Sequence, residues 1–201
     1  MKQTRFMQMK DQMLARYGQQ DGEKLVQLME QEYEKLSSDY ADRPSSLQNH
    51  LHNNIFPVVT AFHALIAMGK SRQQAADEAG AVFLKLMDDI ADSIRRALKV
   101  PGLHRLIPWI FKTMMPKLFT EDAGFRFTFH PTDRHRATFD MQECPYLQVC
   151  RELDCPEIAP VFCATDDTCY GNMHPNLIWN RTKTLARGGD CCDFDLYLQK
   201  K

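Results

Sequence analysis

Residues 125–141 read FRFTFHPTDRHRATFDM, and this stretch decides the fold class. Its first five residues alternate phenylalanine with arginine and threonine, residues 131–134 favour a turn, and residues 135–141 alternate again. Two alternating runs joined by a turn predict a β-hairpin. The apolar residues before Gly124 recur with a helical period instead, so the chain changes from helix to sheet at this point.

A second hairpin is predicted at the C-terminal end of the chain. Residues 176–184 and 191–198 read as its strands, and residues 187–190 (Arg-Gly-Gly-Asp) read as its turn. In the last strand Cys192 and every second residue after it face one way, while Cys191 and every second residue after it face the other. One face of this hairpin is therefore apolar and suited to a core.

Helical periods account for the remaining residues. The predicted helices cover about residues 3–17, 25–38, 47–68, 72–98 and 103–119, followed by two shorter ones between the hairpins, at 145–153 and 155–170. Gly18 separates the first two helices, and Pro57 predicts a kink or a fresh start within the third. Ser71 and Gln74 have the spacing of a capping box at the start of the fourth.

The predicted architecture is α+β, with a helical N-terminal half packed on a small antiparallel sheet formed by two β-hairpins that flank helices. A chain of 201 residues suits one domain, here residues 1–201, with a helical scaffold over residues 1–120 and a cysteine-rich ligand-binding half over residues 121–201. Residues 103–119 also resemble an interfacial membrane helix, but Pro108 and Pro116 interrupt the amphipathic surface and favour a helix packed on the sheet.

The composition argues against several classes of partner. The formal net charge is −1, with 44% hydrophobic and 25% charged residues, so no broad basic surface points to nucleic acid or to an anionic membrane. The N-terminus lacks the apolar core of a signal peptide, and no run approaches the length of a membrane span. We therefore expect a cytoplasmic protein whose partner is a small-molecule substrate; the oligomeric state stays open.

All seven cysteines lie between Cys144 and Cys192. An odd number of cysteines in a cytoplasmic protein indicates thiols rather than a disulfide framework. The spacings contain no C-x2-C pair, so no cofactor or metal is expected. Zinc stays an alternative if separated elements bring together Cys144, Cys163 and Cys192 with Asp166 or His174.

Cys163 has two carboxylates at helical spacing, because Asp166 and Asp167 follow it by three and four residues. A carboxylate by itself raises the pKa of a thiol, so a reactive thiolate at Cys163 also needs a cation. Arg181, Lys183 and Arg187 supply candidates. The alternative is that Cys163 is a small buried apolar residue.

The C-terminal part of the chain is similar to the L-2-amino-thiazoline-4-carboxylic acid hydrolase family over roughly residues 120–198, with looser similarity through the helices from 50 to 100. The matching pieces are Glu143-Cys144-Pro145, then Pro156-Glu157 leading to Phe162-Cys163 and Asp166, and finally Arg181, Thr184-Leu185-Ala186, Gly188, Asp190 and Cys192-Asp193-Phe194. More distantly, the order of hairpin, helices and hairpin looks like the 4-vinyl reductase domain, a small-molecule-binding α+β module.

The first resemblance implies hydrolytic opening of a 2-amino-thiazoline ring, at a C–N or C–S bond, to a carbamoyl-cysteine. For that reaction we expect Cys163 to attack directly or Asp166 to activate water. Arg181 is expected to hold the substrate carboxylate, and Asp190 or Asp193 the amino group.

The resemblance also directs attention to Cys144 and Cys192 beside Cys163, which we expect to line the substrate site. Two alternatives to an enzyme stay open. The second resemblance allows a non-catalytic small-molecule-binding or sensor module, and the cysteines allow a structural zinc protein.

Overall fold

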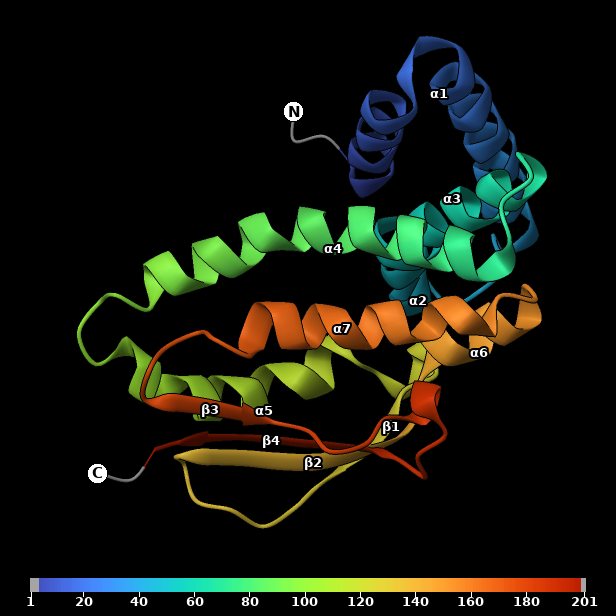
Figure 1. The fold of residues 1–201 in the computed structure, drawn as a ribbon. Coiled ribbons are helices and arrows are strands. Elements are labelled where there is room, and N and C mark those ends of the chain that lie inside the picture. The colour runs from blue at the N-terminus through green and yellow to red at the C-terminus, as the bar shows by residue number, and fades with distance from the viewer. Residues whose placement is uncertain (1–3, 200–201) are drawn as a thin grey trace. The chain divides into compact units, whose positions relative to one another are not determined.

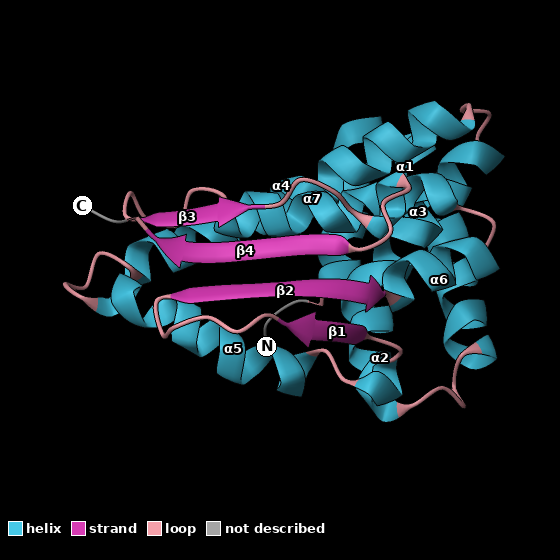
Figure 2. Ribbon diagram, turned by 90° about the horizontal axis from the view of Figure 1, so that it is seen from below, coloured by secondary structure: helices cyan, strands magenta, loops and turns pink. Residues whose placement is uncertain are grey.

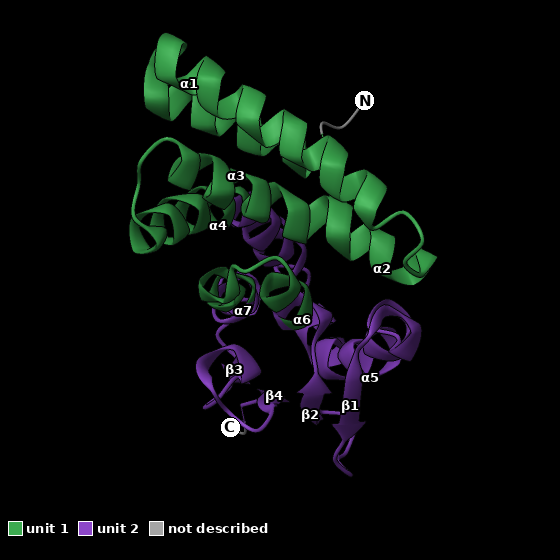
Figure 3. Cartoon of the chain, turned by 90° about the vertical axis from the view of Figure 1, so that its right-hand side faces the viewer, with its two compact units in different colours: residues 1–86, 148–162 green, residues 87–147, 163–201 purple. Residues whose placement is uncertain are grey.

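The computed structural model describes residues 4–199. Its residues group into two compact units, the first made of Met1–Leu86 and Gln148–Phe162 and the second of Met87–Leu147 and Cys163–Lys201 (Figure 3). The elements α4 (Arg72–Ala97), α6 (Pro145–Glu152) and α7 (Ala159–Tyr170) contribute residues to both. The sequence predicts one domain, with a helical scaffold up to residue 120 and a cysteine-rich ligand-binding half after it. This division stays a prediction.

The first unit begins with α1 (Arg5–Asp39), which consists of two helical arms (Figure 1). Gly18 separates them with φ at 73° and ψ at −174°, a conformation that costs glycine little because it has no Cβ. The predicted break at Gly18 is therefore confirmed. Met9 and Met13 of the first arm and Leu25 and Met29 of the second are fully buried, as expected for methionine- and leucine-rich helical stripes.

Proline decides how the next helices are joined. A single π-helical turn, η1 (Leu51–Ile55), connects α2 (Ser45–His50) to α3 (Phe56–Ala67), and Pro57 lies in the first turn of α3. Proline is tolerated there because a first-turn N–H has no partner within the helix. The new α-helical segment expected at Pro57 is present, but it follows the π turn without a break, since His50, Ile55 and Phe56 all keep right-handed helical backbone angles.

The capping box predicted at the start of α4 is present. The Gln74 backbone N–H donates to Ser71 Oγ at 3.3 Å, and the Ser71 backbone N–H donates to Gln74 Oε1 at 3.1 Å. Farther along this helix Gly80 lies against Val161, where an added Cβ would meet Val161 Cγ2 at 2.8 Å. Close packing of α4 on the start of α7, which follows the short turn η4 (Pro156–Ile158), therefore requires glycine at this position.

The second unit contains one antiparallel sheet with strand order β1-β2-β4-β3 (Figure 2). The strands are β1 (Arg126–Phe129), β2 (Arg136–Glu143), β3 (Leu177–Asn180) and β4 (Cys192–Leu198). The two hairpins pair through β2 and β4, with Phe139 opposite Phe194 and Met141 opposite Cys192. The predicted α+β class, with a small antiparallel sheet of two hairpins flanking helices, is confirmed.

Helices cover one face of this sheet. After η2 (Leu103–Leu106), α5 (Ile107–Leu118) packs on the sheet through Ile107 and Phe111, which contact a core of Leu98, Met173, Leu177 and Leu196. A short turn, η3 (Glu121–Ala123), leads from α5 into β1. Within residues 4–199, no helix is both long and apolar enough to cross a membrane.

The closing hairpin differs from its prediction in one respect. Strand β3 ends at Asn180, four residues earlier than expected, and residues 181–191 form a long loop rather than a short turn. The loop contains the 3-10 turn η5 (Leu185–Arg187) and Gly188 with φ at 84°. The Asp193 carboxylate accepts hydrogen bonds from the backbone N–H groups of Thr182 and Lys183, so these two N–H groups bond a side chain of β4 rather than its backbone.

Replacing Ser71 with alanine is expected to lower the free energy of unfolding by about 1 kcal/mol, since one capping hydrogen bond at the start of α4 is lost. Chemical denaturation measures the change. Ser71→Asp keeps an acceptor oxygen at the cap and serves as the matched control, with stability close to that of the unaltered chain. Equal losses in both variants would contradict a capping role for the Ser71 hydroxyl.

Candidate active site

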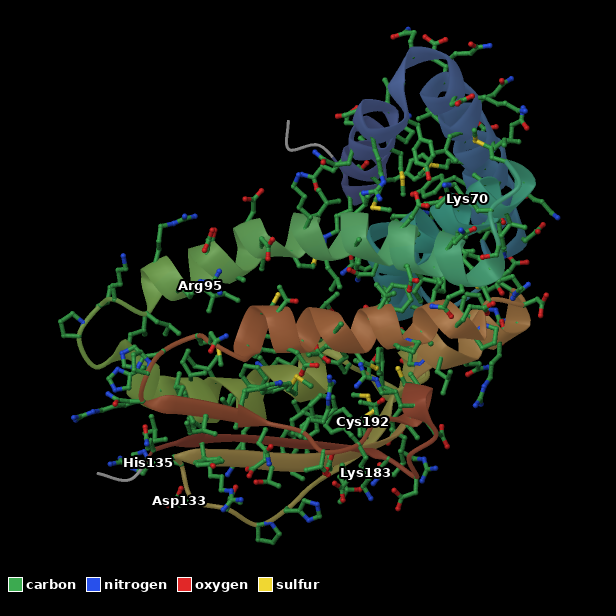
Figure 4. All side chains as sticks on the ribbon, in the orientation of Figure 1. Lys70, Arg95, Asp133, His135, Lys183 and Cys192 are labelled. Carbon is green, nitrogen blue, oxygen red and sulfur yellow. The ribbon has the colours of Figure 1, made fainter. Side chains whose placement is uncertain are left out.

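The second unit brings together side chains from four separate segments. Cys144 lies between β2 and α6, Cys163 and Asp166 lie on α7, Arg181 directly follows β3, and Cys192 begins β4. Each of the three thiols interacts electrostatically with at least one other, since Cys163 acts on both Cys144 and Cys192. Figure 4 shows Cys192 at the start of β4, with Lys183 on the adjoining loop. The structure thus joins five of the seven residues singled out from the sequence.

Arg181 lies at the centre of this group. Its side chain is only 5% exposed. Its guanidinium donates to Asp166 Oδ2 at 3.2 Å, to Asp167 Oδ2 at 2.7 Å and to the Cys163 carbonyl at 2.9 Å. The guanidinium carbon also lies 5.2 Å from the centre of the Phe194 ring, within the range of a cation–π contact. Arg181 is therefore engaged by the protein's own carboxylates, which compete with any substrate carboxylate.

The Asp166 carboxyl has an unusual protonation equilibrium. Burial raises its pKa from 3.8 to about 7, which outweighs the lowering effect of Arg181. Burial disfavours the charged carboxylate because surrounding protein replaces water. Yet 33% of the Asp166 side chain remains accessible, so a small molecule can reach this carboxyl. A carboxyl that titrates near neutral pH is suited to exchange protons during a reaction.

The three thiols of the cluster are held in the protonated form. Burial raises the pKa of Cys144 to about 12, against the lowering effect of the Leu147 and Tyr146 backbone N–H groups. Burial likewise raises the pKa of Cys192 to about 11, although the Leu185 backbone N–H donates to its sulfur at 3.2 Å. The pKa of Cys163 is also raised by burial, which exceeds the opposing effect of Arg181. At neutral pH these side chains are hydrogen-bond donors rather than nucleophilic thiolates.

Thr184 adds a buried hydroxyl to the cluster. The residue is 4% exposed, and within residues 4–199 its Oγ1 makes no aligned hydrogen bond. The hydroxyl nevertheless lies close enough to the Cys163 sulfur to lower the pKa of that thiol. Buried hydroxyl groups in proteins are nearly always hydrogen-bonded, so an unsatisfied one beside a reactive cluster points to a ligand atom or a water as its partner.

Aromatic rings line one side of the cluster. Trp179 lies 5.1 Å from Tyr170 and 5.5 Å from Phe194, measured between ring centres. The Trp179 indole N–H donates to Asp167 Oδ1 at 3.1 Å, which orients the second carboxylate bound by Arg181. Tyr170 also lies near Asp166, whose charge adds to burial in raising the pKa of the Tyr170 hydroxyl.

Asp190 and Asp193 lie apart from this cluster. The Asp190 side chain is 80% exposed and pairs with Lys183 at 2.5 Å. Asp193 uses both carboxylate oxygens on residues 182 and 183, and those hydrogen bonds lower its pKa against the raising effect of burial. Asp193 also faces away from Cys192, because successive residues of a strand point to opposite faces. In this structure both side chains shape the loop that carries Thr184.

A zinc site was an alternative from the sequence. Within the described part of the chain, no group of three or more histidine, cysteine or acidic side chains is arranged to hold a metal ion. His174 stacks on His104 with ring centres 4.0 Å apart instead of joining the thiols.

Comparison with protein families gives a match to one family model, described as L-2-amino-thiazoline-4-carboxylic acid hydrolase, over residues 48–196. The chain belongs to this family. The match spans most of the chain, more than the resemblance seen from the C-terminal motifs, and includes every residue of the cluster. Neither the curated proteins nor the solved structures gave a match.

The sequence did not predict a functional role for two members of the cluster, Thr184 and Asp167. Thr184 belongs to the motif that carries the resemblance, but nothing in its local sequence predicts a buried hydroxyl. Asp167 was considered only as a neighbour of Cys163, and its contacts to Arg181 and Trp179 depend on the pairing of β3. Both required the tertiary structure.

Replacing Arg181 with methionine is expected to lower the free energy of unfolding by about 3 kcal/mol, because a buried ion pair loses its cation and leaves two carboxylates facing each other. Lys183→Met is the matched control, since it removes a solvent-exposed pair with Asp190 and is expected to cost less than about 1 kcal/mol. Urea denaturation compares the two. Similar small losses would show that Arg181 does not organise the cluster.

Proposed function

We propose that this chain is a hydrolase that opens a small sulfur-containing heterocycle of the 2-amino-thiazoline carboxylate type, giving a carbamoyl-cysteine. Family membership supports the reaction class, and one observation supports the site. Asp166 combines a pKa of about 7, an accessible side chain and a fixed orientation set by Arg181. These are the properties of a general base that works at neutral pH.

The proposed reaction begins with water. Asp166, as carboxylate, accepts a proton from a water molecule while the oxygen attacks the amidine-like carbon of the ring. As the C=N double bond becomes single, the protonated Asp166 gives this proton to the ring nitrogen. Asp166 then takes the second proton of the water from the new hydroxyl and passes it to the ring nitrogen or sulfur, while the C–N or C–S bond breaks and the carbonyl forms. One water is consumed and the carboxylate is regenerated. Because the pKa of Asp166 lies near 7, the group can both take and return the proton without a large free-energy cost.

The thiols support this route over direct attack. A nucleophilic cysteine acts as thiolate, and burial raises the pKa of Cys163 above its usual value. In the proposed mechanism Cys163 and Thr184 therefore donate hydrogen bonds to the substrate, and Cys144 and Cys192 shape its surroundings. The proposal uses only water and side chains of this chain, with no cofactor, and treatment with a metal chelator is expected to leave the rate unchanged.

The substrate carboxylate needs a cation, and the geometry favours Arg187 over Arg181. Arg181 already neutralises Asp166 and Asp167. Arg187 lies on η5, acts electrostatically on Cys163, and has no side-chain partner among residues 4–199. In the proposed site Arg187 binds the substrate carboxylate, and Arg181 orients the base.

Replacing Asp166 with asparagine is expected to lower kcat for ring opening by roughly 10²- to 10⁴-fold, the usual contribution of a general base. Asp167→Asn is the matched control, because Asp167 also binds Arg181 but is directed toward Trp179; this variant is expected to keep most of the activity. Turnover of a 2-amino-thiazoline carboxylate, followed by release of a new thiol or a new amine, also identifies which bond breaks. Equal losses in both variants would remove Asp166 from the mechanism.

The pH dependence tests the same residue. In the unaltered chain kcat/KM is expected to rise with pH through about 7, because the active form of Asp166 is the carboxylate and its pKa in the folded protein is about 7. Asp166→Asn is expected to abolish this inflection. Ligand-induced thermal stabilisation without turnover of any cyclic amidine would instead favour a binding module.

A further inference from the structure

The first unit contains a second group of reactive side chains, independent of the proposed active site. It consists of Glu32 on α1, His63 on α3, Cys150 on α6 and Cys155 at the start of η4. His63 Nδ1 lies 2.5 Å from Glu32 Oε1, and the His63 ring also hydrogen-bonds the Cys155 side chain. A cysteine, a histidine and an acid are thus linked in series, as in nucleophilic sites where the acid orients the imidazole.

Two sulfurs meet in this group. The Cys150 side chain hydrogen-bonds the Cys155 side chain, and the Cys155 backbone N–H donates to the Cys150 carbonyl at 2.7 Å. Both residues are fully buried, with 0% exposure, and both are reduced in this structure. The side-chain and backbone contacts therefore place the two thiols within hydrogen-bond reach of each other.

The charges around Cys155 favour the thiolate. The hydrogen bond from Cys150 and the interaction with His63 lower the pKa of Cys155 despite its burial. Burial alone would lower the pKa of His63, but the hydrogen bonds with Cys155 and Glu32 raise it instead. Glu157 and Tyr40 also lie near Cys155; Glu157 opposes the thiolate but is itself paired with Arg72. These interactions favour an imidazolium–thiolate pair, in contrast to the three thiols of the second unit, whose pKa values burial raises.

We propose that Cys155 and Cys150 form a peroxide-reactive dithiol, in which the His63–Glu32 pair holds Cys155 as thiolate and a small hydroperoxide oxidises the two sulfurs to a disulfide. Complete burial restricts the oxidant to a molecule of the size of hydrogen peroxide, which enters during local opening. The same burial keeps larger electrophiles away.

The reaction balances in two steps. The Cys155 thiolate attacks one peroxide oxygen, so an S–O bond forms, the O–O bond breaks, and the leaving oxygen takes a proton from His63. The Cys150 sulfur then attacks the sulfenic sulfur of Cys155, so an S–S bond forms, the S–O bond breaks, and hydroxide leaves as water with the Cys150 proton. Two thiols and one hydroperoxide give one disulfide, one alcohol or water, and one water.

The test treats the full reduced chain with one equivalent of hydrogen peroxide, blocks the remaining thiols, and digests it after Arg, Lys and Glu. This digestion separates residues 144–151 from residues 153–157, which contain Cys155 as their single cysteine. The expected first product links these two peptides, and its yield exceeds oxidation at Cys191. Because this ranking compares cysteines within one unaltered chain, it does not depend on whether any variant folds.

Variants assign the partners. Cys150→Ser is expected to abolish the link and leave Cys155 as a sulfenic acid that a 1,3-dione traps, whereas Cys144→Ser is expected to keep the link. His63→Gln and Glu32→Gln are expected to slow oxidation of Cys155, His63→Gln by roughly tenfold or more, because an ordinary thiol is only a few per cent thiolate at pH 7. Circular dichroism checks that both variants are folded.

The proposal is overturned if Cys155 reacts no faster than Cys191, or if the link persists in Cys150→Ser. It is also overturned if a bulky maleimide labels Cys155 in the folded chain as fast as hydrogen peroxide oxidises it. Ring-opening activity does not enter these measurements, so failure of the proposed hydrolase would leave the result for the dithiol unaffected.

Discussion

A buried guanidinium has to be paired, and this requirement organises the second unit. Arg181 lies at the exit of β3, where 95% of its side chain is removed from solvent. Taking such a charge out of water is costly unless anions and acceptors surround it. Two carboxylates and a carbonyl of α7 meet that need, and the face of Phe194 covers the guanidinium. The pairing fixes the loop after β3 to the helix and holds Asp166 where its pKa approaches neutrality.

Five of the seven cysteines belong to two chemical environments, although they are close together in the sequence. Around Cys163 the neighbours are two thiols, the Asp166 carboxyl and Arg181, and burial raises the pKa of the sulfur despite the arginine. Around Cys155 the neighbours are the Cys150 side chain and an imidazole oriented by Glu32, and these lower the pKa of the thiol. Partners, rather than residue type or burial alone, therefore set the direction in which the pKa of each thiol is shifted.

Local signals predicted much of the fold. The break at Gly18, the start at Pro57 and the capping box at Ser71 follow from the backbone chemistry of single residues, and the two hairpins follow from the alternation of side chains. Helical spacing also placed Asp166 beside Cys163. Local sequence patterns could not predict that Arg181 lies between two carboxylates, because this position depends on how β3 pairs with β4.

The group formed by Glu32, His63 and Cys155 could be predicted even less from local sequence signals. Glu32 and His63 are 31 residues apart and lie on different helices. Cys155 lies farther along the chain, after α6. No periodicity connects these three residues, so only the packing of α1, α3 and η4 reveals them.

The buried hydroxyl of Thr184 has a consequence for selectivity. In the proposed site, a ring that offers a polar atom to this hydroxyl gives it the aligned hydrogen bond that it lacks within residues 4–199, whereas an isosteric ring without that atom does not. An unpaired buried group costs about 1–3 kcal/mol, which corresponds to roughly 5- to 150-fold discrimination between two rings of equal shape. A site of this kind selects its ligand less by fit than by rejecting those that cannot complete its hydrogen bonding.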